Sequence, residues 1–216
     1  VWITHYIELL VDRITPKMVK LILNPTLVIL ISAPIALIVV GPLGTIIGNG
    51  LAVAINFLSA KLGFIIVGIL AATFPFIVMT GMHHALTPIG LNAIATGGTD
   101  SLIFVSQVCA NIAQSGSSFA VAVKSKNENM KQLASAAGVS ALMGITEPAL
   151  YGVTLKLKRP VVAAAIAAGI GGIVGGLLHV SLYIAQNCIM AIPAFIGEKG
   201  MSNLLYGIIM IVVSFV

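Results

Sequence analysis

Charged residues are scarce in this chain, and four long stretches lack them altogether. Only 8% of the 216 residues are Asp, Glu, Lys or Arg, whereas 59% are hydrophobic; a soluble domain has about 25% charged and 45–50% apolar residues. Residues 21–60, 62–99, 101–123 and 160–197 contain no charged side chain. Each stretch exceeds the roughly 20 residues that a helix needs to cross a bilayer. The sequence therefore excludes a soluble domain and predicts a polytopic, all-α integral membrane protein.

Cysteine, cofactor and nucleic-acid signals are also weak or missing. Cys109 and Cys188 lie far apart in apolar stretches, so they indicate neither a disulfide framework nor a metal site, and no cofactor is expected. The net charge is +5, but the basic residues flank apolar segments, as they do in cytoplasmic loops of membrane proteins. This placement argues against a nucleic-acid partner. The chain starts without Met and without a signal-peptide pattern, so we expect it to be a piece of a longer protein.

The first 22 residues differ from the rest because charged and apolar side chains alternate there. Trp2 and Tyr6 accompany Glu8, Asp12 and Arg13, a mixture typical of a helix that lies along the membrane surface. We predict that residues 1–22 form an interfacial amphipathic helix or connector on the cytoplasmic face. The alternative is the end of a preceding membrane span.

Residues 132–155 are small and apolar, and basic residues flank both of their ends. These are Lys124, Lys126 and Lys131 before the segment and Lys156, Lys158 and Arg159 after it. A spanning helix would place one basic cluster outside, whereas a hairpin keeps both inside. The arm 132–143 would be about 18 Å long as a helix, too short for a core of about 30 Å. We predict a re-entrant hairpin with its turn at Gly144-Ile-Thr-Glu-Pro148, the alternative being a kinked spanning helix.

Glu147 is the acidic residue most clearly embedded in an apolar segment. A carboxylate at the bilayer centre costs about 2.5–3.5 kcal/mol, so its presence needs a compensating role. Pro148 disfavours a helical backbone at Glu147, which frees peptide groups beside the carboxylate. Such an unwound turn can bind a neutral polyol, because the carboxylate accepts hydrogen bonds from hydroxyls. A structural salt bridge or a helix cap is the alternative role.

Other polar residues lie in apolar surroundings and are candidates for the same site. His83 and His84 can donate and accept hydrogen bonds, and they could face one cavity if the backbone is irregular near Gly81. The alternative is a histidine bonded to a backbone carbonyl between helices. Asn111, Gln114 and Thr146 are further candidates, although interhelical hydrogen bonding explains them nearly as well. Asp100 is expected to be a solvated loop residue.

Glycines recur in residues 161–182, as Gly171-x-x-x-Gly175 and Gly172-x-x-x-Gly176. This spacing predicts a tightly packed membrane helix and not a nucleotide-binding loop, because no βαβ pattern surrounds it. Residues 183–197 form only a shorter apolar piece.

Three motifs together carry a family resemblance: Met79-Thr-Gly-Met-His-His84, Asn111-Ile-Ala-Gln114 and Gly144-Ile-Thr-Glu-Pro-Ala-Leu-Tyr-Gly152. They resemble the enzyme IIC membrane domain of the bacterial phosphoenolpyruvate-dependent sugar phosphotransferase system. The match is to the glucose superfamily, in its β-glucoside, sucrose and trehalose branch, and runs over nearly the whole chain. The resemblance implies a multi-pass protein of the bacterial cytoplasmic membrane, homodimeric at full length.

The same resemblance implies an elevator-like permease with a scaffold domain and a mobile substrate domain that contains two re-entrant hairpins. Residues 23–216 would be the substrate-binding transport domain, while the scaffold helices and the IIB domain are absent from this chain. Glu147 would be the family's sugar-binding glutamate, and the pair His83-His84 its sugar-contacting histidine segment. Whether Glu147 also assists catalysis as a base is left open.

The implied function is translocation of a glucoside or disaccharide, with a β-glucoside favoured and sucrose or trehalose as alternatives. The sugar would be phosphorylated on its 6-hydroxyl by a phosphocysteine on the IIB domain, and IIA would supply the phosphoryl group to IIB. This chain alone is expected to be inactive. Glucose-type relatives have a basic residue shortly before the histidine pair, and residues 71–82 contain none, which argues against glucose. The competing hypothesis is a proton-coupled secondary sugar transporter that uses Glu147 as its proton carrier.

Overall fold

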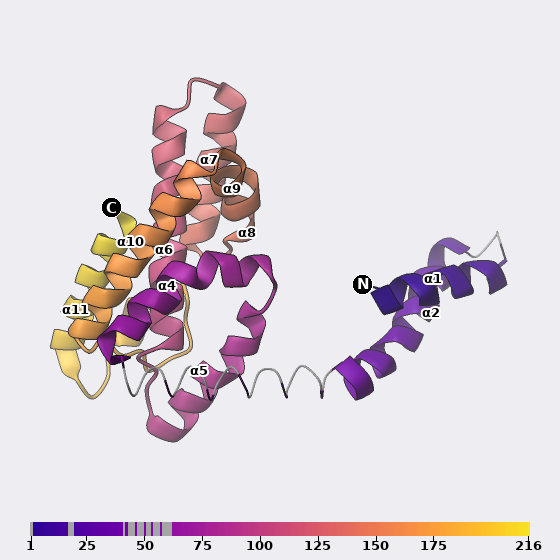
Figure 1. The fold of residues 1–216 in the computed structure, drawn as a ribbon, viewed down its shortest axis with the longest axis horizontal. Coiled ribbons are helices and arrows are strands. Elements are labelled where there is room, and N and C mark those ends of the chain that lie inside the picture. The colour runs from indigo at the N-terminus through magenta and orange to yellow at the C-terminus, as the bar shows by residue number, and fades with distance from the viewer. Residues whose placement is uncertain are drawn as a thin grey trace. The chain divides into compact units, whose positions relative to one another are not determined.

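The computed structural model describes residues 2–16, 20–40, 42, 46, 50, 53, 57 and 62–216. Nearly all of the regular structure in these residues is helical, as the composition predicts (Figure 1). The chain divides into two compact units, Val1–Leu51 and Ala52–Val216.

In residues 2–16 and 20–40 of the first unit, two helices pack against each other. Helix α1 spans Trp2–Ile14, and α2 spans Lys20–Ile35 and continues as a π-helical segment, Ala36–Val40. An ion pair of 2.7 Å between Lys20 Nζ and Asp12 Oδ2 joins the two helices. Tyr6, Leu10 and Ile14 of α1 are exposed apolar side chains. The position of α1 at a membrane surface stays a prediction.

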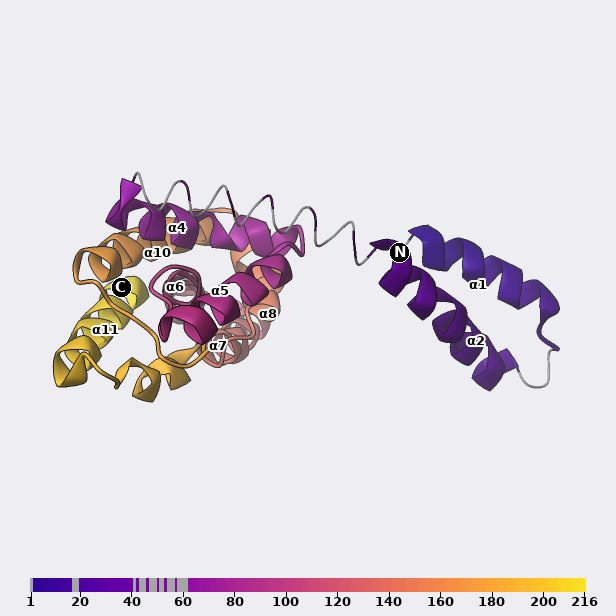
Figure 2. The same ribbon diagram turned by 90° about the horizontal axis from the view of Figure 1, so that it is seen from below.

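In the second unit, the long helix α6 (Ile103–Lys124) is surrounded by the other helices. Figure 2 looks along α6 and shows α4 (Phe64–Met79), α5 (His83–Gly97), α7 (Glu128–Leu142), α10 (Arg159–Leu177) and α11 (Gly200–Phe215) around it. Every residue of α6 from Ile103 to Gly116 is buried. A helix that is buried on all sides forms the centre of a core, so α6 is the element on which the unit is built.

Glycines allow α10 to pack closely on two neighbours at once. A Cβ on Gly172 would lie 2.8 Å from the Gly68 Cα of α4, and a Cβ on Gly171 would clash with Ser214 of α11. Small residues at a helix interface let backbones approach in this way. The predicted tight packing of this glycine-rich helix is therefore confirmed, with alternate glycines serving different partners.

One helix in the described residues is both long and apolar enough to cross a membrane by itself, namely the 19-residue α10, Arg159–Leu177. Shorter apolar helices occur at Leu23–Ile38, Phe64–Met79 and Gly200–Phe215. Many of their outward-facing side chains are large and apolar, including Ile69, Ile166 and Leu205. Such surfaces are those expected of helices that contact lipid.

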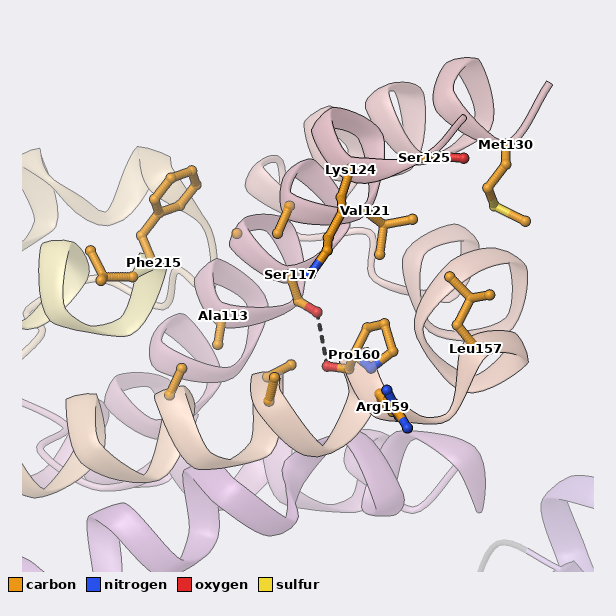
Figure 3. A pocket seen from close by; sticks show the side chains of 16 residues that line it. Ala113, Ser117, Val121, Lys124, Ser125, Met130, Leu157, Arg159, Pro160 and Phe215 are labelled. Carbon is orange, nitrogen blue, oxygen red and sulfur yellow. Dashed lines mark hydrogen bonds between the residues drawn. The ribbon is translucent and has the colours of Figure 1, made fainter. Parts of the chain in front are cut away.

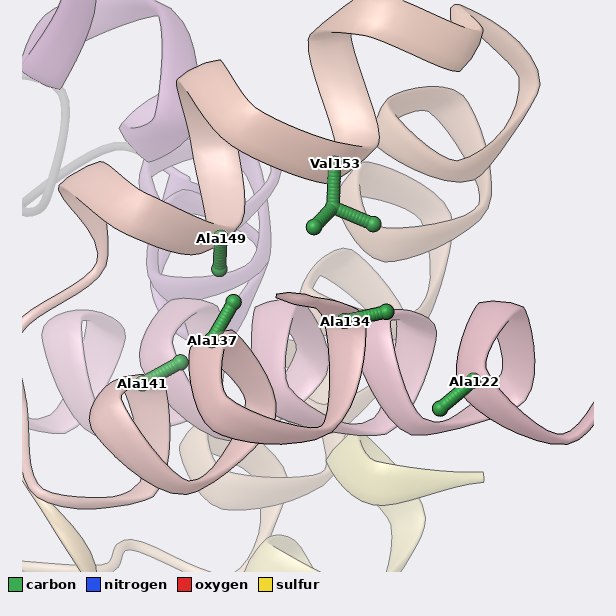
Figure 4. Packing of buried hydrophobic residues seen from close by; sticks show 6 residues of the cluster. All are labelled: Ala122, Ala134, Ala137, Ala141, Ala149 and Val153. Atoms are coloured by element: carbon green, nitrogen blue, oxygen red, sulfur yellow. The ribbon is translucent and has the colours of Figure 1, made fainter. Parts of the chain in front are cut away.

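Residues 128–157 form a helical hairpin. Helix α7 leads into a turn, and the return arm consists of α8 (Glu147–Ala149), a π-helical segment (Leu150–Thr154) and α9 (Leu155–Leu157). The contact between the arms and α6 is made by a cluster of small buried side chains (Figure 4): Ala122, Ala134, Ala137, Ala141, Ala149 and Val153. The chain thus reverses direction here and does not continue as the kinked helix that was the alternative.

Both ends of this hairpin lie at the same end of the unit. Lys124, Ser125 and Met130, before or at its start, line one groove together with Leu157 and Arg159 from its end. This agrees with the reasoning from the two flanking basic clusters. Entry of the hairpin into a membrane, the second re-entrant hairpin and an elevator-like movement stay predictions.

Asp100 was expected to be solvated, and this expectation is wrong. Its side chain is only 2% exposed. The carboxylate accepts hydrogen bonds from the backbone N–H groups of Ile103, at 3.2 Å, and Phe104, at 2.6 Å, at the start of α6. The backbone of Asp100 exchanges hydrogen bonds with Leu182. Asp100 therefore holds the beginning of the central helix against the loop that follows α10.

Candidate functional site

The turn at the tip of the hairpin has a fixed backbone. Gly144 has a φ of +91°, a conformation that residues with a side chain rarely adopt. Its N–H donates to the carbonyl of Ala141 at 3.0 Å, and the Ile145 N–H donates to that of Ser140, also at 3.0 Å. The Ser140 hydroxyl donates in return to the Ile145 carbonyl at 2.9 Å. These bonds close the end of α7 and hold the following residues in one position.

Glu147 is the first residue of the return arm. It opens α8, so its backbone is helical and the expectation that Pro148 keeps it unwound is wrong. The helix dipole favours a negative charge at this position, and Pro148 suits the start of a helix. The residue is exposed. Its carboxylate makes no hydrogen bond or ion pair with any other residue that the structure describes. Both carboxylate oxygens are therefore free to accept hydrogen bonds from a ligand.

Of the two histidines, His83 is within electrostatic range of Glu147. His83 begins α5, and the imidazole rings of His83 and His84 have centroids 4.0 Å apart. The rings therefore lie together although adjacent residues of a regular helix point about 100° apart. The Glu147 carboxylate is close enough to His83 for an electrostatic interaction. The Nδ1 atom of His83 is buried and has no hydrogen-bond partner within the described residues.

Asn111, Gln114 and Thr146 are buried, and the first two bind other elements near the tip. The Asn111 Nδ2 group donates to the backbone carbonyl of Asn187 at 2.6 Å. The Gln114 Oε1 atom accepts a hydrogen bond of 3.0 Å from the Thr154 hydroxyl of the return arm. The Gln114 bond is an interhelical contact, which was the alternative explanation, whereas Asn111 bonds to a loop. A direct contact of these three residues with a ligand stays a prediction.

One residue near the tip was missed by the reasoning from the sequence. Besides its bond to Asn111, Asn187 lies against the turn, because a Cβ on Gly144 would come within 2.8 Å of its Oδ1 atom. Asn187 lies in the loop 178–199, which has only short 3₁₀ turns at Ile189–Ala191 and Pro193–Phe195. The one signal in the sequence is that Gln186 and Asn187 are adjacent amides in an otherwise apolar piece.

The family comparison agrees with the three motifs at this site. A family described as "Phosphotransferase system, EIIC" matches residues 1–169 of the chain. The chain belongs to this EIIC family. The match covers the histidine pair, the Asn111–Gln114 segment and the hairpin with Glu147.

Curated relatives are similar over most of this EIIC chain. The PTS system arbutin-, cellobiose-, and salicin-specific EIIBC component of Escherichia coli (strain K12) is 44% identical over 82% of the chain and 36% of its own length. The beta-glucoside-specific EIIBCA component of Bacillus subtilis (strain 168) is 43% identical over 100% of the chain and 35% of its own length. The sucrose-specific EIIBC component of the same organism is 33% identical over 97% of the chain and 45% of its own length.

The EIIC chain thus spans about a third to a half of the length of these relatives. No solved structure matches it. The coarse conclusions from the sequence, which are membership of the phosphotransferase system and the β-glucoside and sucrose branch, are confirmed by these comparisons.

Glu147, His83 and His84 do not line either of two cavities that lie within residues 62–216. One is a groove of about 620 Å³ between α6 and α10, near the basic ends of the hairpin (Figure 3). The other, of about 220 Å³, lies where α4 starts and α10 ends, next to His179 and Lys199. The group of Glu147, His83 and His84 is instead on the surface of the unit.

Proposed function

We propose that this EIIC chain is the substrate-handling part of a sugar permease of the phosphotransferase system, and that its sugar is a β-glucoside. The observation that carries the proposal is the unpaired Glu147 carboxylate at a fixed turn, beside His83. A sugar presents hydroxyl groups that both donate and accept hydrogen bonds. A carboxylate that only accepts and an imidazole that does both complement such a ligand without requiring it to be charged.

The preference for a β-glucoside rests on the relatives. The two that are 43% and 44% identical are named for β-glucosides or for arbutin, cellobiose and salicin, whereas the sucrose component is 33% identical. Sucrose and trehalose remain the alternatives that an experiment has to separate. The branch itself is favoured by the same motifs at residues 79–84, 111–114 and 144–152.

The hairpin enters the membrane from the cytoplasmic side in this proposal. Its two ends lie together and carry five Lys and one Arg at residues 124–159, and cytoplasmic loops collect such residues. The turn with Glu147 then lies within the membrane, where irregular backbone is tolerated only beside a cavity or protein. We expect scaffold helices of the full-length homodimer to cover the exposed face of Glu147, α1 to lie along the cytoplasmic membrane surface, and the substrate domain to move as in an elevator.

The chemical step belongs to the complete protein. The names EIIBC and EIIBCA of the relatives indicate fused IIB and IIA domains, and we expect such domains as partners. The phosphoryl group would pass from a cysteine sulfur of IIB to the sugar 6-hydroxyl, so that an S–P bond breaks and an O–P bond forms. Glu147 orients the sugar, and as a base it would accept the hydroxyl proton.

The test is uptake by the full-length permease in a strain that lacks its own glucoside permeases. Salicin, cellobiose, sucrose and trehalose are supplied with and without the phosphoenolpyruvate relay. We expect relay-dependent accumulation of the 6-phosphate of salicin or cellobiose. Unmodified sugar that accumulates without the relay and is lost on adding an uncoupler would instead establish the proton-coupled alternative.

The role of Glu147 is tested by Glu147→Gln, which keeps the shape and removes the charge. Hydrogen bonds to a charged group contribute about 1.5–3 kcal/mol, so sugar affinity should fall about 10- to 150-fold. Glu198→Gln is the matched control, because Glu198 is an exposed acid outside the site, and it should bind sugar normally. Normal affinity in Glu147→Gln would refute the assignment.

A further inference from the structure

The groove between α6 and α10 is a second site, separate from the Glu147 turn. It has a volume of about 620 Å³, within the range of about 300–1,000 Å³ found for small-molecule sites. Small side chains of both helices form its walls, among them Ala113 and Ala120 of α6 and Ala163 and Ala167 of α10. Phe215 of α11 closes one side (Figure 3).

Two cations stand at one end of this otherwise apolar groove. Figure 3 shows the Lys124 side chain pointing into the groove from α6, with Arg159 on the side of α10. Neither has an ion pair with any residue that the structure describes. The nearby Ser117 hydroxyl is already committed, since it donates to the Pro160 carbonyl at 2.8 Å. The site therefore combines two unpaired positive charges with an apolar groove.

The length of the groove corresponds to one membrane leaflet. Its lining runs along α6 from Lys124 to Ala113, which is about 16 Å at 1.5 Å per residue. Half of a hydrocarbon core is about 15 Å thick. The direction of the groove in the bilayer rests on the topology proposed above, in which the cations mark the cytoplasmic end. The groove then extends from the headgroup region of the cytoplasmic leaflet to the middle of the bilayer.

We infer that this groove binds one anionic phospholipid, with its phosphate between Lys124 and Arg159 and an acyl chain along the alanine walls. A sugar does not fit, because the walls offer few hydrogen-bonding groups. Basic pockets between helices on the cytoplasmic side are typical sites for anionic headgroups. An acyl chain also accounts for the exposed apolar lining, which includes Leu157 and Phe215.

The test uses the full-length permease, purified in detergent, and native mass spectrometry with added dioleoyl phosphatidylglycerol. One tightly held phosphatidylglycerol per protomer is expected, and dioleoyl phosphatidylcholine should bind much more weakly. Each basic residue near an anionic lipid contributes a factor of about five, so the double variant Lys124→Gln/Arg159→Gln should weaken binding about 25-fold. Lys126→Gln/Lys131→Gln removes the same charge outside the groove and should bind as the wild type does.

A second variant tests the acyl chain without changing the charge. Ala163→Leu fills the groove and should also release the lipid, whereas Ala95→Leu, at an exposed alanine of α5, should not. Equal binding of both lipids, or unchanged binding in both groove variants, would overturn the inference and favour another segment of the permease as the occupant. Displacement by inorganic phosphate alone would show an anion site without an acyl chain. These readouts are independent of sugar transport, so failure of the proposed function would leave them unaffected.

Discussion

Replacing Gly144 by alanine tests whether the rigid turn positions the site. Two costs follow from the geometry of the turn. Gly144 has a φ of +91°, and a non-glycine residue held in such a region costs about 1–3 kcal/mol. A Cβ there would also lie 2.8 Å from Asn187 Oδ1 and 3.0 Å from Cys188 Cβ, so the loop that bonds Asn111 has to move. We expect the native turn to lose about 1–3 kcal/mol relative to relaxed turns, a factor of about 5 to 150.

The matched control is Gly152→Ala in the return arm. A Cβ at this position meets nothing closer than Leu133 Cδ2, at 3.7 Å, which is an ordinary contact. Alanine in a helix is favoured over glycine by about 0.5–1 kcal/mol, so this variant should be as stable as the wild type or more so. Both variants are compared in the full-length permease by thermal unfolding in detergent and by the sugar affinity of the folded protein.

A double variant separates the two costs at Gly144. Asn187→Ala removes the Oδ1 atom but not the Cys188 Cβ contact, so Gly144→Ala/Asn187→Ala should recover part of the steric cost and leave the backbone strain. If the turn positions Glu147, the double variant should exceed Gly144→Ala in sugar affinity as well as in stability. If Gly144→Ala has the same melting temperature and the same sugar affinity as Gly152→Ala, the turn is not the element that positions Glu147.

Two further substitutions test the packing that supports the site. Gly172→Ala places a Cβ 2.8 Å from Gly68 Cα and Val67 O of α4, so it should lower stability by about 1–3 kcal/mol; a melting temperature at or above that of the wild type would contradict the close contact of α4 and α10. Asp100→Ala removes the acceptor for two N–H groups at the start of α6 and should cost about 0.5–2 kcal/mol. Asp100→Asn keeps one acceptor and should lose less, so equal losses in the two variants would show that the cap does not stabilise α6.

Local patterns in the sequence predict much of the fold, because a membrane helix can be recognised from the composition of a short segment. The absence of charge across residues 160–197 indicates α10, and the spacing of Gly172 and Gly176 indicates its close contact with a neighbour. The hairpin is predicted from charge as well, since basic residues at both ends are incompatible with a single crossing. Each of these inferences uses residues that are near one another in the chain.

The errors and omissions concern contacts between distant segments. Asp100 follows a glycine pair and looks like a surface residue, but its backbone pairs with Leu182 and its carboxylate caps α6. Asn187 lies in a piece without a periodic pattern, and only its bond to Asn111, 76 residues away, brings it to the tip. A single sequence does not show which distant residue pairs with Asp100 or with Asn187.

The placement of the two basic residues at the groove explains why charge patterns predict topology better than function. Lys124 and Arg159 are counted equally with Lys126, Lys131, Lys156 and Lys158 when the cytoplasmic end is assigned, because topology depends on the sum of nearby charges. The structure distinguishes Lys124 and Arg159 from the other four basic residues, because α6 and α10 bring these two to one apolar groove. We therefore expect phosphatidylglycerol binding to be lost in the Lys124→Gln/Arg159→Gln variant but not in the Lys126→Gln/Lys131→Gln variant. Such a difference would show that the position of a basic residue in the fold, and not its charge alone, determines lipid binding. Equal effects in the two pairs would mean that the basic end attracts lipid as a diffuse charge, without a site.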